Sequence, residues 1–461
     1  MFSFYLYLYA YTCQPQYAPV VKLKELTISN FKCFKSEQTF KFGKITLLLG
    51  ENSSGKSSIM QAIWAPLQSG EFPFTFSPNG DLMNLGSFKD IVWGHDTDRE
   101  IRIKMEFEDH SLEKLSTSLH NHDTYWIENK HNQQPELNTI EGIYDIITND
   151  PDANSYPAFY LQAKNINGQI KIIKISSSLE DAKFSNPEYA KPIKELHTKY
   201  PQLAYNINLD TASLKNHENK AKFETIILFW NTFAYQTIST YLSSYRLPPE
   251  RTYQETTKRY LKVGTFGEGY LDQILRWQTE NDTRYIKLIE TMQGLGLLQN
   301  INARRMDGGR YEFQIQTKNN NVNASISDVG FGISQIMPVL VADLQLSGDS
   351  TLYVQEPETH LHPSVQAAYG AHLVERATNT NKTYVIETHS EYLINSLRLA
   401  IVKGEIAPED VQVYFTENTG DDTTVHDVKF TKQGTIEQAP DNFFRTYMMG
   451  VLDIALNAEA E

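Results

Sequence analysis

One segment near the start of the chain limits its possible folds more than any other feature. Gly50 to Ser57 reads GENSSGKS, directly after the apolar run ITLLL and before a stretch with helical spacing over 58–67. Glycine and small residues let successive backbone N–H groups curl around phosphate oxygens, and the first turn of the following helix adds partial positive charge. The sequence therefore predicts a strand, a phosphate-binding loop and a helix in direct succession.

The residues of this loop have separate expected roles. The Lys56 ammonium should reach the β- and γ-phosphates of a nucleoside triphosphate, and the Ser57 hydroxyl should coordinate Mg²⁺. ATP with Mg²⁺ is therefore the expected ligand. Its contacts are expected from the loop and the first helical turn, namely Gly50, Asn52, Ser53, Ser54, Gly55, Lys56, Ser57 and Ser58.

A second element lies at 352–358, where the apolar pattern of LYV gives way to QEPE. Glu356 is the candidate general base, because a carboxylate at a strand end can take a proton from an attacking water. Gln355 directly precedes it as a candidate metal contact. An amide brings no charge and binds Mg²⁺ only weakly, so this residue predicts slow hydrolysis.

A third element follows the apolar run at 384–386, which ends in ETHS. His389 lies between this strand and a helical pattern over 391–401. A histidine at such a position can donate a hydrogen bond to the γ-phosphate and so report its presence. His389 is therefore the second candidate catalytic residue beside Glu356.

A glycine–serine loop, SDVGFGISQ over 327–335, precedes another helical pattern. Gly330, Gly332 and Ser334 at a helix start form a candidate anion-binding nest, and a glycine turn with a helix cap is the alternative.

A metal site at His360 and His362 would need two further ligands that the sequence does not identify. A subunit contact beside the nucleotide is the preferred interpretation of these two histidines.

Composition narrows the class of protein. Lys plus Arg is 42 and Asp plus Glu is 56, so the formal net charge is −14. An acidic chain does not coat nucleic acid with its whole surface, although a local basic groove for DNA is compatible with this balance. Two cysteines make no disulfide framework and fit a reducing cytosol. No apolar run approaches the ~20 residues of a membrane span.

The order of the motifs suggests how the chain is divided. From about residue 109 to 230 the chain is rich in Asn, His, Asp and Lys, which is typical of an inserted arm or lobe with long loops. The expected parts are an N-terminal extension (1–20), a first part of the head (21–108), the inserted lobe (109–300) and a second part of the head (301–461).

The motifs together resemble ATPases related to the overcoming-lysogenisation-defect family and the ATPase subunit of Septu-type phage defence. The resemblance covers both ends of the chain well and the middle poorly. It is carried by LTISNFKCF (26–34), GENSSGKSS (50–58), LGSFKDIVWGHD (85–96), DVGFGISQIMPVL (328–340), QEPETHLHPSVQA (355–367), ETHSEYLINSLR (387–398) and FTKQGTIEQAPDNFF (430–444).

This resemblance implies an α/β fold of the ABC-ATPase type. A RecA-like head with a mixed sheet would be joined to an antiparallel β subdomain, as in Rad50 and SMC heads, and would carry a large inserted lobe. Nucleotide would be bound between paired heads of a homo-oligomer, with the glycine–serine loop of one subunit covering the ATP of the other. Gln355 stands where such ATPases have an acid for Mg²⁺.

The resemblance also implies a role in a complex. Overcoming-lysogenisation-defect nucleases end in a Toprim nuclease domain, and the stretch after His389 is too short for one. A nuclease, HNH-like in Septu-type systems, is therefore expected as a separate chain that the ATPase regulates.

Two other classes of ATPase fit the sequence less well. A DNA-repair head like Rad50 would need a long heptad arm, and 109–269 contains no sustained heptad pattern. A transporter subunit would need a coupling loop soon after the first helix, which 71–90 does not resemble, and would leave no place for the long insert.

Overall fold

The fold is built on a seven-stranded sheet that contains the phosphate loop. A computed structural model describes residues 22–68, 78–99, 101–107, 114–119, 139–145, 158–166, 169–177, 239–255, 262–317, 323–346, 348, 350–440 and 443. The sheet has the order β18-β17-β16-β3-β15-β14-β9. Its strands are β3 (Ile45–Gly50), β9 (Thr240–Leu242), β14 (Thr351–Gln355), β15 (Thr383–Glu387), β16 (Val411–Asn418), β17 (Thr423–Phe430) and β18 (Ile436–Glu437).

The five strands from β9 to β16 run parallel, and β17 and β18 continue the sheet antiparallel. All five residues of β14 are buried, as are the first five of β3. Near-continuous apolar strands of this kind belong to parallel sheets that are covered on both faces. The carboxyl ends of the parallel strands therefore meet at one protected edge.

Strand β15 lies between β3 and β14, which decides what meets at that edge. In the ladder, Glu387 at the end of β15 pairs with Leu48 of β3 on one side. On its other side it pairs with Gln355, the last residue of β14. The end of β15 is thus adjacent both to the strand that leads into the phosphate loop and to the strand that carries Glu356.

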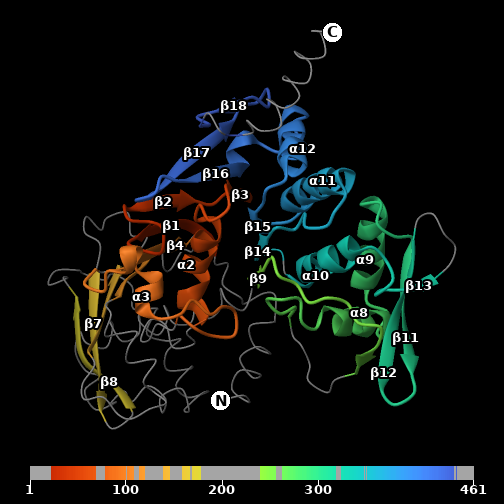
Figure 1. The fold of residues 1–461 in the computed structure, drawn as a ribbon, viewed down its shortest axis with the longest axis horizontal. Coiled ribbons are helices and arrows are strands. Elements are labelled where there is room, and N and C mark those ends of the chain that lie inside the picture. Colours follow the sequence, from red (N-terminus) through yellow and green to blue (C-terminus); the bar gives the residue numbers. More distant parts are fainter. Residues whose placement is uncertain are drawn as a thin grey trace, which may run out of the picture.

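Alternate side chains of the central strands enter two separate cores. On one face, Leu47 and Leu49 join a cluster with Val354 and Ile386; on the other face, Leu48 joins Tyr353 and Val385. This alternation follows from the two-residue period of a strand. Figure 1 shows the corresponding layers on the two sides of the sheet.

The face with Leu48 is covered by helix α2 (Lys56–Gln68) and a four-stranded antiparallel sheet. The Trp64 ring of α2 packs edge-on against Tyr353, with ring centroids 5.4 Å apart. The antiparallel sheet has the order β2-β1-β4-β5. Its strands are β1 (Leu23–Ser29), β2 (Gln38–Lys41), β4 (Ile101–Phe107) and β5 (Lys114–Leu119), with the short helices α3 (Phe88–Ile91) and η1 (Trp93–His95) alongside.

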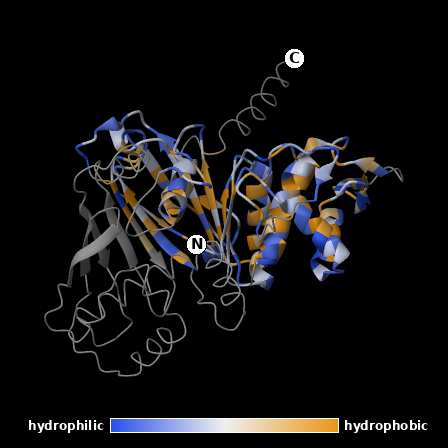
Figure 2. Cartoon of the chain, turned by 90° about the horizontal axis from the view of Figure 1, so that it is seen from below, coloured by the Kyte–Doolittle hydropathy of each residue, from blue (hydrophilic) through white to orange (hydrophobic). Residues whose placement is uncertain are grey.

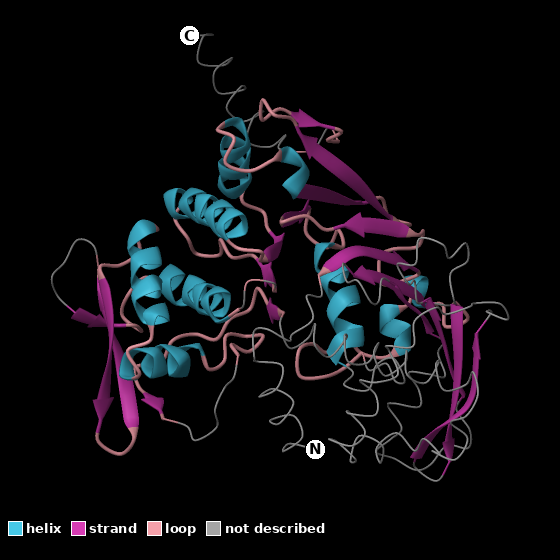
Figure 3. Ribbon diagram, turned by 180° about the vertical axis from the view of Figure 1, so that it is seen from behind, coloured by secondary structure: helices cyan, strands magenta, loops and turns pink. Residues whose placement is uncertain are grey.

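The face with Leu47 is covered by a layer of helices. This layer comprises α8 (Tyr270–Thr279), α9 (Thr283–Gly294), α10 (Phe331–Gln345), α11 (Pro363–Asn379) and α12 (Glu391–Val402), with η5 (Pro408–Asp410) before β16. A second antiparallel sheet packs beside α8 and α9 and is formed by β10 (Tyr253–Gln254), β11 (Asn300–Met306), β12 (Arg310–Gln316) and β13 (Asn323–Ser325). Figure 3 shows these helices and this sheet from behind.

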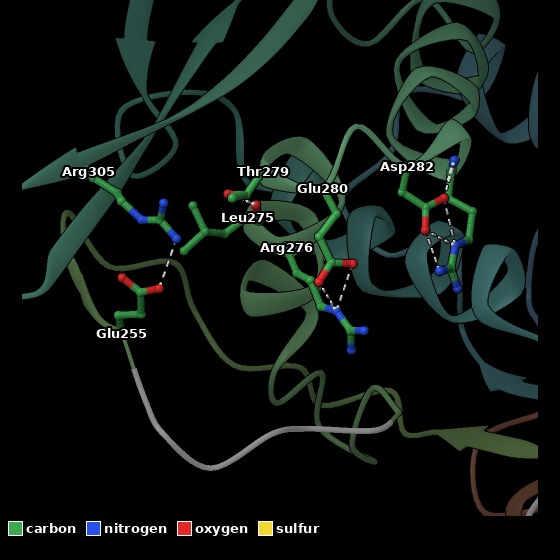
Figure 4. Close-up of polar contacts among 8 residues, drawn as sticks. Glu255, Leu275, Arg276, Thr279, Glu280, Asp282 and Arg305 are labelled. Atoms are coloured by element: carbon green, nitrogen blue, oxygen red, sulfur yellow. Dashed lines mark hydrogen bonds and ion pairs between the residues drawn. The ribbon is translucent and has the colours of Figure 1, made fainter. Parts of the chain in front are cut away.

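Hydropathy explains how the layers are held together. In Figure 2 the hydrophobic residues lie mainly on the central strands and the helices packed against them, and the loops are mostly hydrophilic. On the outer side of the helical layer, polar contacts fix the connection between two helices (Figure 4): Arg276 pairs with Glu280 at the end of α8, and Asp282 caps α9 by accepting from the Arg284 N–H. Such exposed pairs contribute little stability each.

The structure confirms the predicted α/β head with a mixed sheet and an antiparallel subdomain. It also places residues 239–300, which the expected division put in the inserted lobe, differently. Strand β9 pairs with β14 in the central sheet, and α8 and α9 form part of the helical layer. Composition missed this because β9 is only three residues long and follows a polar stretch.

Upstream of β9, the structure describes a three-stranded sheet of β6 (Thr139–Asp145), β7 (Ala158–Ile166) and β8 (Gln169–Ser177), which includes the strand expected at 169–175. The N-terminal extension at 1–20 and residues 178–238 lie outside the described residues. Among the described helices, none is both long and apolar enough to cross a membrane.

Candidate nucleotide site

Two glycines, Gly50 and Gly55, determine the backbone shape of the loop after β3. Gly50 has φ 142° and Gly55 has φ 106°, both in the region that favours glycine. A Cβ at Gly50 would lie 2.3 Å from the Thr416 carbonyl oxygen, and one at Gly55 would lie 2.6 Å from the Cys33 sulfur. The loop can therefore hold its curled shape only with glycine at these two positions.

Inside the loop, the predicted residues divide into exposed and structural ones. Asn52 and Ser53 are exposed, and Ser58 is half-buried at the start of α2. The Ser54 hydroxyl instead faces inward, donating to the Glu51 carbonyl at 2.8 Å and sharing a 2.7 Å hydrogen bond with the Thr416 hydroxyl. The Ser54 side chain thus anchors the loop to β16, and only its backbone remains for a ligand.

Lys56 lies at the first position of α2 with its ammonium folded over the loop. Its Nζ donates to the carbonyl oxygens of Gly50 at 3.0 Å and Glu51 at 2.6 Å. Burial lowers the pKa of Lys56, and the nearby carboxylates of Glu387, Glu356 and Glu51 act against that shift. The lysine is therefore a cation surrounded by acidic groups that come from three different segments.

A chain of hydrogen bonds runs across the strand ends. The Ser57 hydroxyl donates to Glu387 Oε1 at 2.7 Å, and the Gln355 amide donates to Glu387 Oε2 at 2.6 Å. The Tyr241 hydroxyl, from β9, donates to Gln355 Oε1 at 2.9 Å. Glu387 is 3% exposed, and burial raises the pKa of its carboxyl against the opposing effect of Ser57, Gln355 and Lys56.

Glu356 lies directly after Gln355, on a tight turn at the end of β14. Its φ is 44°, and its N–H donates to the Glu387 carbonyl at 2.7 Å. The buried Arg246 guanidinium donates to the carbonyls of both Gln355 and Glu356. Burial lowers the pKa of Arg246 to about 10, so it remains a cation at neutral pH. The hydrogen bond to Glu387 and the Arg246 guanidinium therefore both hold the left-handed turn that carries the candidate base.

His389 completes the same edge of the sheet. Its side chain is exposed, and its backbone N–H donates to the buried Glu358 carboxylate at 2.7 Å. Although the residue is exposed overall, partial burial of the ring, and then the Lys56 ammonium, lower the pKa of His389, while Glu356 acts in the opposite direction. The imidazole is thus neutral at pH 7 and lies close enough to Lys56 and Glu356 to feel both charges.

The structure therefore brings Lys56, Ser57, Gln355, Glu356 and His389 together around one edge of the sheet.

The glycine–serine loop at 327–335 presents only part of the predicted anion site. Gly330 is exposed at the N-terminus of α10, but Ser334 is 1% exposed and its hydroxyl donates to the Phe331 carbonyl within the helix at 2.8 Å. The Ser334 side chain is directed inward because it lies one turn inside the helix.

The two histidines at 360 and 362 have separate structural contacts. His362 caps α11 by accepting from the Ser364 N–H, and the His360 ring packs edge-on against Phe331 at a centroid distance of 5.0 Å. In the part of the chain that the structure describes, no three His, Cys, Asp or Glu side chains are grouped to hold a metal ion.

Sequence reasoning missed four residues of this region. Glu387 had a signal, since an acidic residue ends an otherwise apolar strand two positions before His389. Glu358 lay within a noticed motif but had no predicted contact. Tyr241 and Arg246 had no signal, because they lie 114 and 109 positions from the residue Gln355 that they contact.

The AAA ATPase domain family matches residues 22–394. No curated protein matches the chain. Solved structures with a similar fold include an SMC head domain from Thermotoga maritima, with 9% identity and a TM-score of 0.36 over 88% of this chain and 99% of that one.

Two further structures are SMC heads bound to parts of ScpA. One, from Pyrococcus furiosus, has an extended coiled coil and is bound to the C-terminal domain of ScpA; it has 9% identity and a TM-score of 0.39 over 94% of this chain and 100% of that one. The other, bound to the C-winged helix domain of ScpA, has 11% identity and a TM-score of 0.40 over 89% of this chain and 98% of that one.

Proposed function

The chain belongs to the AAA ATPase domain family, and we propose that it binds Mg²⁺–ATP at the sheet edge described above and hydrolyses it slowly to regulate a partner nuclease. The observation that carries the proposal is the hydrogen bond between Ser57 Oγ and Glu387 Oε1 at 2.7 Å. It joins the phosphate loop to the strand end that precedes His389.

Binding would begin at the phosphate loop. Exposed backbone around Asn52 and Ser53 and the start of α2 offer N–H groups to phosphate oxygens. The Lys56 ammonium would turn from the Gly50 and Glu51 carbonyls to the β- and γ-phosphates, exchanging neutral acceptors for charged ones. The Ser57 hydroxyl and the carboxylate bonded to it are oxygen ligands of the kind that Mg²⁺ prefers, and the Gln355 amide lies beside them. Bound Mg²⁺ would neutralise charge on the triphosphate.

Hydrolysis would rely on Glu356 and His389. The Glu356 carboxylate is fixed on a clamped turn and would accept a proton from a water aligned with the γ-phosphate. The neutral His389 imidazole would donate a hydrogen bond to a γ-phosphate oxygen, where negative charge is concentrated. Charge stabilisation and alignment of the water are the main contributions a protein makes to phosphoryl transfer.

We further propose that a second copy completes the site. Gly330 is exposed at the start of α10, where backbone N–H groups face away from the helix and favour an anion. Because the Ser334 hydroxyl is used inside α10, the backbone at Gly330 and Gly332 would make this contact. The proposed assembly is a homo-oligomer in which each loop covers the neighbour's ATP.

The proposed biological role is regulation of a separately encoded nuclease, HNH-like, in a prokaryotic anti-phage defence complex. It rests on the resemblance of the motifs to Septu-type ATPase subunits. A net charge of −14 also favours a role in which a partner, rather than this chain's overall surface, engages DNA.

The experiment that tests this role is co-purification of the chain with the product of its neighbouring gene, followed by a nuclease assay with and without ATP. Regulation predicts that ATP changes DNA cleavage by the complex and that Lys56→Ala removes the response. A partner that is a phosphoesterase would instead indicate a DNA-repair head, and a polytopic membrane protein would indicate a transporter.

A further inference from the structure

We propose that Glu387 supplies the carboxylate that holds Mg²⁺ beside Ser57, and that Gln355 positions Glu387 instead of binding the metal. The inference rests on the proposed Mg²⁺–ATP site and deepens it. In effect, the metal-binding acid has moved from the end of β14 to the laterally paired position at the end of β15.

Sheet topology makes this relocation possible. Because β15 lies between β3 and β14, its last residue is nearer to the phosphate loop than the last residue of β14. Glu387 Oε1 is 2.7 Å from the Ser57 hydroxyl, the other expected metal ligand. An ion held by Ser57 would therefore have Glu387 as its neighbouring carboxylate.

The orientation of Gln355 argues against a metal role for its side chain. A carboxylate accepts hydrogen bonds and cannot donate them, so the 2.6 Å contact to Glu387 Oε2 must come from the Gln355 NH₂ group. The Gln355 carbonyl oxygen then points to Tyr241, which donates to it at 2.9 Å. Both ends of the amide are occupied, so neither is free to bind a cation.

Burial adds a physical reason for a cation. Glu387 is 3% exposed, and in the described part of the chain its carboxylate forms no salt bridge, because the Lys56 ammonium is directed to backbone carbonyls. A buried carboxylate whose hydrogen-bond donors are all neutral is costly, and the nearby Lys56 ammonium opposes that cost only in part, since the pKa of Glu387 is still raised. A divalent ion between Ser57 and Glu387 would supply that charge.

The test moves the carboxylate between the two strands. In the double variant Gln355→Glu with Glu387→Gln, the hydrogen-bond chain can be kept with its polarity reversed: the new amide accepts from Ser57 and donates to the new carboxylate, which still accepts from Tyr241. The single variant Glu387→Gln removes the carboxylate altogether. Glu391→Gln, in the first turn of α12, changes the net charge equally and serves as the control.

Calorimetry of the full chain would compare ATP affinity with Mg²⁺ and with EDTA. We expect Glu387→Gln to reduce the gain in affinity due to Mg²⁺ at least about tenfold. ATP affinity in EDTA should not fall, because Lys56 and the loop are untouched and the lost carboxylate no longer repels the triphosphate. The double variant should recover most of the gain, and Glu391→Gln should match the wild type. A full Mg²⁺ gain in Glu387→Gln would overturn the inference.

A measurement on the wild type covers the case in which a variant fails to fold. In crystals grown with Mn²⁺ and a non-hydrolysable ATP analogue, the anomalous peak of the metal should lie about 2–2.5 Å from a Glu387 oxygen. A metal that reaches Glu387 only through water would contradict the inference. Absence of ATP binding by the wild type, with or without metal, would contradict the proposed function itself.

Discussion

Ser57 and Glu387 lie 330 positions apart in the sequence, and a 2.7 Å hydrogen bond joins the hydroxyl of one to the carboxylate of the other. The contact connects the start of the helix after the phosphate loop with the end of strand β15. The proposed site depends on this contact between distant segments. His389 follows Glu387 by two positions, and Glu356 donates its N–H to the Glu387 carbonyl, so both candidate catalytic residues are placed through Glu387.

Removing the Lys56 ammonium should abolish ATP binding. Lys56→Ala takes away the main point charge for the β- and γ-phosphates, and we expect at least about a hundredfold loss of affinity in calorimetry, equivalent to ~2.7 kcal/mol. Lys44→Ala is the matched control, because Lys44 precedes β3 and forms an exposed salt bridge with Asp410. Unchanged affinity in Lys56→Ala would show that the loop does not bind the phosphates.

Replacing Glu356 by glutamine should separate binding from hydrolysis. The amide keeps the size of the side chain but cannot accept a proton from water, so turnover should fall at least about a hundredfold while ATP affinity stays within a few-fold. Steady-state phosphate release and calorimetry measure the two quantities. Persisting turnover would assign the base to another group.

Arg246 should maintain the turn on which Glu356 sits. Arg246→Lys keeps the charge but loses the fork that reaches the carbonyls of Gln355 and Glu356. We expect a loss of about 2 kcal/mol in unfolding free energy, together with a lower kcat at little-changed KM. Equal stability and kcat would mean that the turn needs no such clamp.

Complementation between subunits tests the composite site. A Cβ at Gly330 would meet no atom within 4 Å, so Gly330→Glu should fold normally while placing a negative charge at the proposed contact with a neighbour's γ-phosphate. Gly330→Glu and Glu356→Gln should each be inactive alone. Mixed together, they should regain ATPase activity, because one site of each hetero-oligomer combines an intact Glu356 with an intact Gly330. Mixtures no more active than their parts would contradict composite sites.

Glu358 offers a pH test. Burial raises the pKa of its carboxyl, with opposing hydrogen bonds that include the one from the His389 N–H. The folded state therefore holds the proton more strongly than the unfolded state. The stability this contributes is fully present below the unfolded pKa of about 4.3 and is lost as the pH rises through the folded pKa.

Glu358→Gln should lack this loss. The difference in Tm between Glu358→Gln and the wild type should therefore shift in favour of the variant between pH 4.5 and pH 8. Differential scanning fluorimetry without nucleotide measures it. A difference in Tm that does not vary with pH would show that the carboxyl titrates alike in both states.

Local patterns were enough to predict the main elements of the head. The apolar run before Gly50 and the helical spacing after it predicted β3 and α2, which extend from Ile45 to Gly50 and from Lys56 to Gln68. The strand ends before Glu356 and His389 were equally evident. These features depend on short-range periodicity and on the positions of glycines, which can be recognised within a short stretch of sequence.

Long-range pairing was not predictable in the same way. That β15 lies between β3 and β14 follows from strand register, so the contact of Glu387 with Ser57 and Gln355 has no local signal. The sequence marked Gln355 as a departure from the acidic residue of the ATPases it resembles, but its hydrogen-bond partner Glu387 lies on the neighbouring strand and could not be found from local pattern. Ser334 was expected to face a ligand, yet helical geometry turns its hydroxyl inward.

The central claim is that His389 and the phosphate loop act on the same triphosphate. The most direct measurement is the affinity of His389→Ala for ATP and for ADP, each with Mg²⁺. Loss of one hydrogen bond to the γ-phosphate should weaken ATP binding about tenfold or more and leave ADP binding unchanged. Equal affinities of variant and wild type for both nucleotides, or an equal loss for both, would contradict the account.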